Sequence, residues 1–251
     1  GRPIERNCPA PASPDPQNSR GPSPLDGRGD GDDHDHADQV GEGRRTDRVQ
    51  TLPGARPWTV TVVCGASGVG KSRVAIPLAA RYGVPLGEVD DIVTAVRVLT
   101  SAEDQPELHF WETYPDFGSW SPERIADLHF SSSTVLLPAL RAVIADHIEF
   151  DAPVVLEGDY LLPELAIGFG DAVRAVVLEE TDVDRIAANL GAREPDADHG
   201  FRAAVSLEVG ARLAARAHDI GVPVVSPWPW LDGLDRVDTA LFTAGEATHP
   251  G

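Results

Sequence analysis

The chain of 251 residues contains no methionine, two cysteines and a single lysine, Lys71. Its 40 acidic residues outnumber its 21 basic ones, which gives a net charge of −19 at pH 7. Proteins that bind duplex nucleic acid or anionic membranes need many Lys and Arg contacts to phosphate, so this shortage of positive charge argues against both partners. Because the other 20 basic residues are arginines, the position of the one lysine is informative.

Long apolar runs are also absent. No run approaches the roughly 18 residues of a membrane-spanning helix, and the start of the sequence has no apolar signal core. Cys8 and Cys64 lie in very different contexts, so we expect no disulfide framework. These absences indicate a soluble, cytoplasmic protein without a membrane partner. The sequence does not indicate its oligomeric state.

Residues 1–57 differ in composition from the rest. They hold 8 Gly and 9 Pro but only five Leu, Ile, Val or Phe, too few to bury a core that offsets chain entropy. We therefore predict a disordered tail rich in Gly, Pro and Asp over residues 1–57, followed by one folded domain over residues 58–251.

Short, Val-rich segments alternate with helical patterns in that domain. The patterns predict helices over residues 70–82, 121–148 and 199–219. They predict strands, covered on both faces, over residues 59–64, 85–89, 153–157, 173–178 and 222–225. This alternation indicates an α/β fold with a parallel sheet of about five strands flanked by helices. We interpret residues 97–150 as a helical cap insertion and residues 185–205 as a lid.

A phosphate-binding loop follows the first predicted strand. The sequence fits G-x-x-x-x-G-K-[ST], with a helical pattern directly after it. In such a loop the backbone N–H groups and the helix N-terminus bind phosphates, the lysine reaches the β- and γ-phosphates, and the Ser hydroxyl binds Mg²⁺. The predicted nucleotide-binding residues are Gly65, Ala66, Ser67, Gly68, Val69, Gly70, Lys71 and Ser72.

Several classes of P-loop protein lack support in the sequence. A guanine-reading [NT]-K-x-D element would need a second lysine. An Asp-Glu pair of the AAA+ type is absent from the strand that reads VVLEG, and no ABC-type signature occurs. Elimination favours a small-molecule kinase with the P-loop fold of nucleotide-kinase type.

Two adjacent carboxylates follow the second predicted strand, about twenty residues after the lysine. Asp90 and Asp91 would lie at the carboxyl edge of the sheet, where ligands bind in open α/β folds. A carboxylate there could accept the proton of an acceptor hydroxyl. Because adjacent strand residues point to opposite faces, we expect one of the two to act, with Asp90 favoured.

Arg185, Asn189 and Arg193 recur at a spacing of four residues before a segment rich in Gly, Pro and Asp. Arginines carried by a closing lid would stabilise the transferring phosphoryl group. We predict this role for Arg193 and Arg185; the alternative is a solvated basic helix face.

Four segments together resemble the 2-phosphoglycerate kinase-like group of P-loop kinases over roughly residues 58–245. They read GASGVGKS, VDDI, VVLEGDYLLPEL and VVLEETDVDRIAANLGAR. The resemblance implies ATP and Mg²⁺ as cofactors, and transfer to a hydroxyl of a small phosphorylated acid. By position it implies Asp90 as the aspartate after strand two, Glu157 as the acid that holds Mg²⁺ through water, and Arg193 as the lid arginine. The chain departs from the pattern at Val93, where the group has an arginine.

Two aromatic segments lie outside these motifs. Trp111, Tyr114, Phe117 and Trp120 would either line an acceptor pocket or form the core of a small cap. Trp228, after the last predicted strand, would either stack on the adenine or belong to a rigid surface turn.

The sequence therefore predicts an enzyme that transfers the γ-phosphoryl group of MgATP to a hydroxyl of a small molecule. The acceptor could be a phosphorylated acid, a nucleoside or a natural-product hydroxyl. The alternative is an ATP-binding regulatory protein with little turnover that acts through a protein partner.

Overall fold

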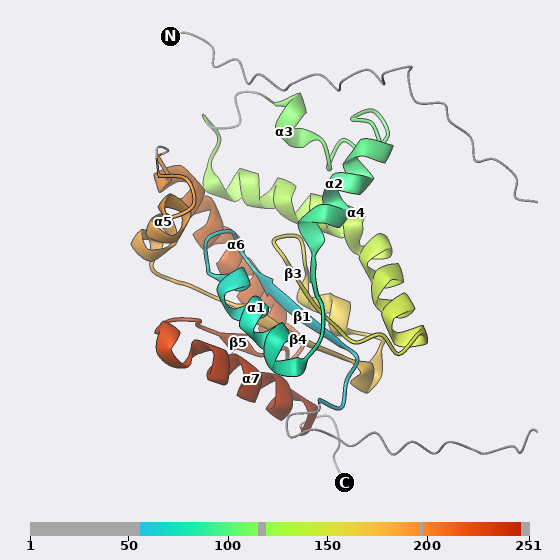
Figure 1. Ribbon diagram of the computed structural model, residues 1–251. Coiled ribbons are helices and arrows are strands. Elements are labelled where there is room, and N and C mark those ends of the chain that lie inside the picture. Colours follow the sequence, from blue (N-terminus) through green and yellow to red (C-terminus); the bar gives the residue numbers. More distant parts are fainter. Residues whose placement is uncertain (1–55, 115–118, 196–197, 247–251) are drawn as a thin grey trace, which may run out of the picture. The chain divides into compact units, whose positions relative to one another are not determined.

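A five-stranded parallel sheet forms the centre of the domain (Figure 1). The computed structural model describes residues 56–114, 119–195 and 198–246, so residues 1–55 of the predicted tail lie outside the described residues. The strands are arranged in the order β2-β3-β1-β4-β5. Their bounds are β1 Val60–Gly65, β2 Leu86–Glu88, β3 Val154–Gly158, β4 Val173–Leu178 and β5 Val224–Val225. This order, with the P-loop directly after the central strand, is the nucleotide-kinase type of P-loop NTPase fold, as predicted.

The three inner strands explain the Val-rich sequence pattern. Each has a strand on both sides and helices over both faces, and every residue of β1 and β3 is buried. The edge strands are shorter than predicted, with three residues in β2 and two in β5, and none of these five residues is buried. Contrary to the expectation, these two strands are not buried, because each lies at an edge of the sheet where no further strand shields its outer side.

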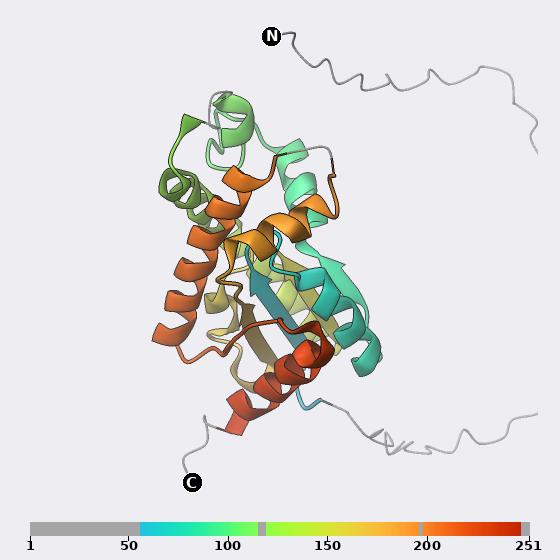
Figure 2. The ribbon, with the colours of Figure 1, turned by 90° about the vertical axis from the view of Figure 1, so that its left-hand side faces the viewer.

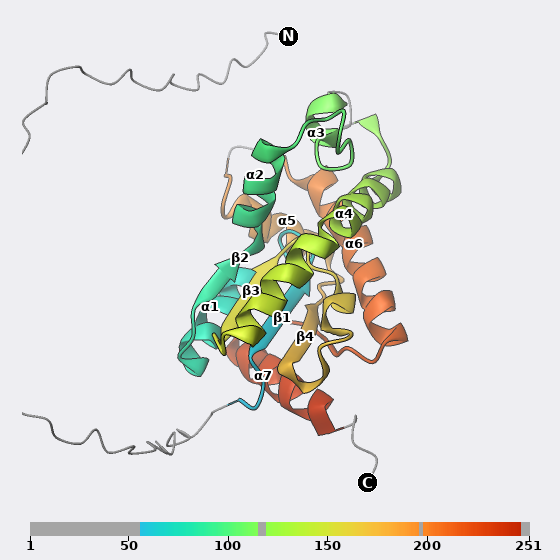
Figure 3. The same cartoon turned by 90° about the vertical axis from the view of Figure 1, so that its right-hand side faces the viewer.

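Helices cover the sheet in two layers (Figures 2 and 3). Helices α1 (Lys71–Tyr82) and α7 (Trp230–Glu246) pack on one face. Helices α4 (Pro122–Glu149) and α6 (Gly200–Asp219) pack on the other, together with the short 3₁₀ helix η2 (Pro163–Ala166). A second 3₁₀ helix, η3 (Gly170–Ala172), leads into β4. Ser121 caps α4, its hydroxyl accepting a hydrogen bond from the Arg124 N–H.

The remaining helices lie beyond the carboxyl ends of the strands, where the P-loop is (Figures 1 and 3). They are α2 (Val89–Leu99), α3 (Phe110–Thr113) and α5 (Val183–Gly191). In a parallel α/β sheet this edge is the ligand-binding edge. The predicted insertion (residues 97–150) includes α3 and only the last three residues of α2, and the predicted lid (residues 185–205) includes most of α5. The bounds of both remain predictions.

Two local predictions are wrong. Because β2 ends at Glu88, Asp90 and Asp91 lie in the first turn of α2 and not on a strand, so their side chains do not alternate between sheet faces. Two acids in a first helical turn are favoured by the positive end of the helix dipole, a signal that the sequence already carried. Arg193 does not share a helix face with Arg185, because α5 ends at Gly191.

Helix α4 is long and apolar enough to cross a membrane by length and composition alone, with a mean hydropathy of 1.3 over its most apolar window. Within the described residues it is the only such helix. Leu136, Leu140 and Ile144 of this helix are fully buried in the domain core, whereas 28% of the apolar window as a whole is buried.

Candidate nucleotide and acceptor site

The P-loop connects β1 to the N-terminus of α1, and two of its glycines are fixed by close contacts. Gly68 (φ 76°) lies under α5, where an added Cβ would be 2.9 Å from Leu190 Cγ. Gly70 (φ 97°) begins α1, and an added Cβ would be 2.3 Å from the ring of Trp230. Both backbone conformations would strain any residue with a Cβ, so only glycine fits at these positions. The loop leaves the N–H groups of the first turn of α1 without helical partners, as an anion site requires.

Lys71 is the first residue of α1 and is 7% exposed. Its ammonium donates a hydrogen bond to the Ala66 carbonyl oxygen at 2.8 Å and forms an ion pair with the Asp159 carboxylate. Burial alone would raise the pKa of Asp159, but the Lys71 charge, with help from His129 and Ser67, holds that pKa below its usual value. Asp159 is therefore an anion that is held by the only lysine of the chain.

The sequence analysis did not single out Asp159. It follows β3, the immediate neighbour of β1 in the sheet, and β3 ends at the same edge as the P-loop. An acid just past the end of that neighbouring strand was the available signal. It was overlooked because Glu157, two residues earlier, already matched the expected acid.

Ser72 and Glu157, the two residues predicted to hold Mg²⁺, are hydrogen-bonded to each other. The Ser72 hydroxyl donates to Glu157 Oε1 at 2.7 Å, and Glu157 is only 5% exposed. Among the described residues no ion pair neutralises the Glu157 carboxylate. Hydroxyl and carboxylate oxygens are ligands that Mg²⁺ prefers, so the donor set fits this ion. No group of three or more His, Cys, Asp or Glu side chains in the described part of the chain could hold a metal, as expected if phosphates and water supply the other ligands.

Asp90 lies at the start of α2, within range of the Lys71 charge. Partial desolvation raises the pKa of its carboxyl, the negative charges of Asp159 and Glu157 raise it further, and the Lys71 charge opposes them. These groups act on Asp90 because they lie close to it. Asp91 lies about 100° further around the helix axis, so the two carboxylates are directed differently.

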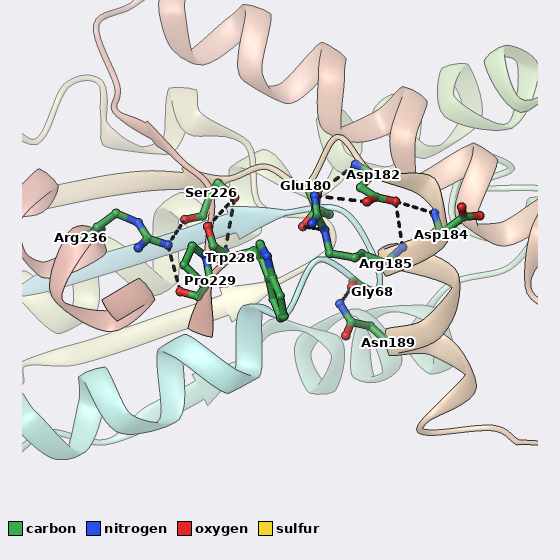
Figure 4. A network of polar contacts seen from close by, with 10 residues as sticks. All are labelled: Gly68, Glu180, Asp182, Asp184, Arg185, Asn189, Ser226, Trp228, Pro229 and Arg236. Atoms are coloured by element: carbon green, nitrogen blue, oxygen red, sulfur yellow. Dashed lines mark hydrogen bonds and ion pairs between the residues drawn. The ribbon is translucent and has the colours of Figure 1, made fainter. Parts of the chain in front are cut away.

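Helix α5 is attached to the P-loop (Figure 4). The Asn189 side-chain amide donates to the Gly68 carbonyl oxygen at 2.8 Å. Ile186 and Leu190, both buried, pack over the same glycine. Asn189 therefore holds the loop in place, a contact that its sequence spacing from Arg185 did not reveal.

Arg185 lies beside Trp228 at the edge of the P-loop (Figure 4). Its guanidinium contacts both Glu180 oxygens, at 3.0 and 3.2 Å, and Asp182 at 3.3 Å. The same group is 5.5 Å from the centre of the Trp228 ring, and Trp228 is 42% exposed. Two carboxylates thus fix a planar cation next to an accessible aromatic ring.

The loop that carries Trp228 is braced from α7. Arg236 donates to the carbonyl oxygens of Ser226, at 2.9 Å, and Pro229, at 3.2 Å (Figure 4). Trp230 lies against Gly70, with the Arg73 guanidinium 4.3 Å above its ring. The sequence analysis missed this role of Trp230, which joins the last loop to the P-loop.

The other lid residues differ in their partners. Arg193 is exposed just after α5, and within the described residues it forms no ion pair. Arg202 near the start of α6 is bound to the Glu194 carboxylate, at 2.9 and 3.0 Å. Arg193 is thus the freer of the two arginines.

A cavity of about 190 Å³ adjoins the P-loop. Ser67 and Asp159 form its wall on the side of the loop. Four ring-bearing side chains from α3, α4, α6 and the end of β3 form much of the remainder, namely Trp111, His129, Phe201 and Tyr160.

Of the four aromatic residues that the sequence analysis grouped together, Trp111 lines this cavity. Tyr114 and Trp120 pack against each other, with ring centres 5.0 Å apart. Phe117 lies outside the described residues. Tyr114 is 42% exposed, so this ring pair lies partly at the surface. Whether the cavity beside Trp111 binds an acceptor stays a prediction.

Comparison with known protein families and with curated proteins finds no match. Solved structures with a similar chain course include the shikimate kinase from Acinetobacter baumannii in complex with shikimate. The two sequences are 13% identical, the match covers 77% of this chain and 96% of the shikimate kinase chain, and the TM-score is 0.46. A gluconokinase from Sinorhizobium meliloti 1021 is 16% identical; the match covers 78% of this chain and 99% of the gluconokinase chain, and the TM-score is 0.41. The shikimate kinase from Bacteroides thetaiotaomicron is 14% identical; the match covers 73% of this chain and 98% of that kinase, and the TM-score is 0.38. The fold assignment rests on the strand order and the P-loop.

Proposed function

We propose that the protein is an MgATP-dependent phosphotransferase that acts on a hydroxyl group of a small molecule. The observation that carries the proposal is the arrangement at one edge of the sheet. Lys71 and the Ser72–Glu157 pair lie on the nucleotide side, and a separate cavity begins at Ser67 and Asp159. A phosphate cradle next to a pocket for a second molecule is what group transfer between two substrates requires.

The P-loop residues Gly65 to Ser72 would bind the phosphates through backbone N–H groups and the Lys71 ammonium. Mg²⁺, held by Ser72 and through water by Glu157, would neutralise charge on the β- and γ-phosphates. Arg185 and Trp228 flank the position next to the P-loop where a planar base would stack, so we propose that they bind the adenine. This assigns Arg185 to the base and leaves Arg193 as the lid arginine that would stabilise the transferring phosphoryl group.

In the proposed step the acceptor oxygen forms a bond to the γ-phosphorus while the bond from that phosphorus to the β–γ bridging oxygen breaks, which releases ADP. The proton of the acceptor hydroxyl passes to the Asp90 carboxylate. We favour Asp90 over Asp91 because the groups that shift the pKa of Asp90 belong to the P-loop and to the end of β3. A pKa raised above the usual value makes Asp90 a stronger base than an ordinary aspartate.

The test measures ADP release from MgATP with a panel of hydroxyl compounds that includes 2-phosphoglycerate, shikimate, gluconate, nucleosides and aromatic alcohols. The proposal predicts at least one acceptor that raises ADP release well above its absence, with no such rise for Lys71→Ala.

Asp90→Asn separates the proposal from the regulatory alternative. A kinase needs this carboxylate for turnover and not for nucleotide binding. A regulatory protein would be indifferent to the substitution in both respects. ATP binding without any acceptor-dependent turnover, unchanged in Asp90→Asn, would contradict the kinase proposal.

A further inference from the structure

We propose that the cavity beside the P-loop takes a neutral acceptor with one flat hydrocarbon ring and a short hydroxyl-bearing arm, and not a phosphorylated or sugar acid. This inference rests on the proposed kinase function and names the substrate class of its acceptor site. Its basis is the chemistry of the cavity wall, which differs from that of a site built for an anion.

Rings and aliphatic side chains form most of the wall. Trp111, Tyr160, His129 and Phe201 surround the cavity, and Val205 adds apolar surface from α6. The His129 and Tyr160 rings are stacked, with centres 5.0 Å apart and planes 21° apart. A flat ring can pack edge-to-face or offset against such a wall, with little loss of side-chain entropy.

His129 in the cavity wall is paired through its donor nitrogen. His129 Nε2 donates to the Asp159 carbonyl oxygen at 2.9 Å, so its second nitrogen is the acceptor in the neutral ring. Burial lowers the pKa of His129, although Asp159 opposes the shift, so the ring is neutral at pH 7. The neutral His129 ring therefore offers no N–H donor to a hydroxyl group of a sugar.

The charges of the site disfavour an anionic acceptor. Among the described residues, Arg202 is the only arginine or lysine in the cavity wall, and its Nη1 donates hydrogen bonds to both oxygens of the Glu194 carboxylate. On the side of the P-loop, Asp90, Glu157 and Asp159 place three carboxylates around the one ammonium of Lys71. A phosphate or carboxylate on the acceptor would meet this excess of negative charge, and the described residues of the cavity wall offer it no arginine or lysine that is not already ion-paired.

The size and position of the cavity agree with a single ring. A protein cavity of about 150 Å³ lined by apolar side chains holds a benzene molecule, and this one measures about 190 Å³. Ser67 and Asp159 belong to the cavity wall, and Asp159 contacts Lys71. An arm that leaves the ring toward these residues brings its hydroxyl next to the phosphate cradle.

The test is isothermal titration of the full chain, saturated with MgADP, with 2-phenylethanol and 2-(4-hydroxyphenyl)ethanol on one side and 2-phosphoglycerate and shikimate on the other. We expect the two aromatic alcohols to bind at about millimolar concentration or tighter, and the two acids to bind at least about tenfold more weakly. Phe201→Ala, which removes one ring of the wall, is expected to weaken alcohol binding about fivefold or more. Phe150→Ala, the same substitution at a ring that is 69% exposed and outside the cavity, is expected to leave it unchanged.

The outcomes for the acceptor class and for the enzymatic activity are distinguishable. Alcohol binding that depends on Phe201 supports the inference even if no phosphoryl transfer follows, in which case the kinase proposal fails by itself. Tighter binding of the acids, or alcohol binding that is indifferent to Phe201→Ala, overturns the inference. Failure of all four compounds to bind overturns the inference as well. Phosphoryl transfer to 2-phosphoglycerate would overturn the acceptor class and leave the kinase proposal intact.

Discussion

The ammonium of Lys71 is ion-paired with the carboxylate of Asp159, which lies 88 positions later in the chain. The pair joins the P-loop to the end of β3, and Asp159 also lines the cavity. A nucleotide that binds to Lys71 through its phosphates must share the ammonium with Asp159 or replace it. The pair would therefore couple the proposed nucleotide binding to the wall of the proposed acceptor cavity.

Asp159→Asn is expected to destabilise the nucleotide-free protein by about 1–3 kcal/mol, because it leaves a buried ammonium without its anionic partner. Phosphates would then supply the missing negative charge, so MgADP should raise the unfolding temperature more in this variant than in the wild type. Thermal unfolding with and without MgADP measures both effects. Asp127→Asn, at an exposed carboxylate paired with Arg212, is the control. If MgADP raised the unfolding temperature equally in Asp159→Asn and in the wild type, the result would contradict the coupling.

The pH dependence of turnover is expected to report Asp90. A base acts only when ionised, and the pKa of Asp90 is raised by desolvation and by the neighbouring carboxylates. As pH falls, kcat/KM should therefore decline through a pKa above the ordinary aspartate value of about 3.9. Asp90→Asn should lower kcat about 10²–10⁴-fold and leave ATP affinity within about threefold. The prediction fails if the residual kcat/KM of Asp90→Asn declines with falling pH through the same pKa as that of the wild type.

Gly70→Ala is expected to destabilise the protein by about 2–4 kcal/mol, since the new Cβ would meet the Trp230 ring in a left-handed backbone conformation. Gly210→Ala is the matched control. Gly210 lies within α6, its added Cβ meets nothing within 4 Å, and the change should stabilise the protein by about 0.5–1 kcal/mol. Chemical denaturation measures both. The change in the free energy of unfolding must have opposite signs in the two variants. A loss of stability at both positions would contradict the account of the loop.

Trp228→Ala tests the proposed adenine site. Removal of one stacking partner should weaken ATP binding about fivefold or more, whereas inorganic tripolyphosphate, which has no base, should bind unchanged. Titration of both ligands into wild type and variant provides the comparison. Equal weakening of both ligands would show that Trp228 acts through the P-loop and not on the base.

The P-loop and the order of strands and helices could be predicted because they depend on local signals. The spacing of Gly65, Gly70 and Lys71, and the capping of α4 by Ser121, are properties of a few consecutive residues. The helical position of Asp90 was misjudged at a boundary, where β2 contributes only three residues and the strand pattern is too short to be decisive.

The residues that the sequence did not reveal are joined across long separations. Asp159 reaches Lys71, Asn189 reaches Gly68, and Trp230 packs on Gly70 only once the sheet has brought these loops together. None of these contacts has a periodic signature. The cavity likewise combines Trp111, Tyr160 and Phe201 from three separate elements, so its aromatic character is visible only in the folded chain.

The central claim is transfer of the γ-phosphoryl group to an organic hydroxyl and not to water. Phosphorus NMR of MgATP incubated with the protein and the acceptor panel tests it most directly. The account predicts a growing phosphomonoester resonance in step with ADP, absent with Lys71→Ala. Formation of inorganic phosphate alone, or no change in ATP while it binds, would contradict it.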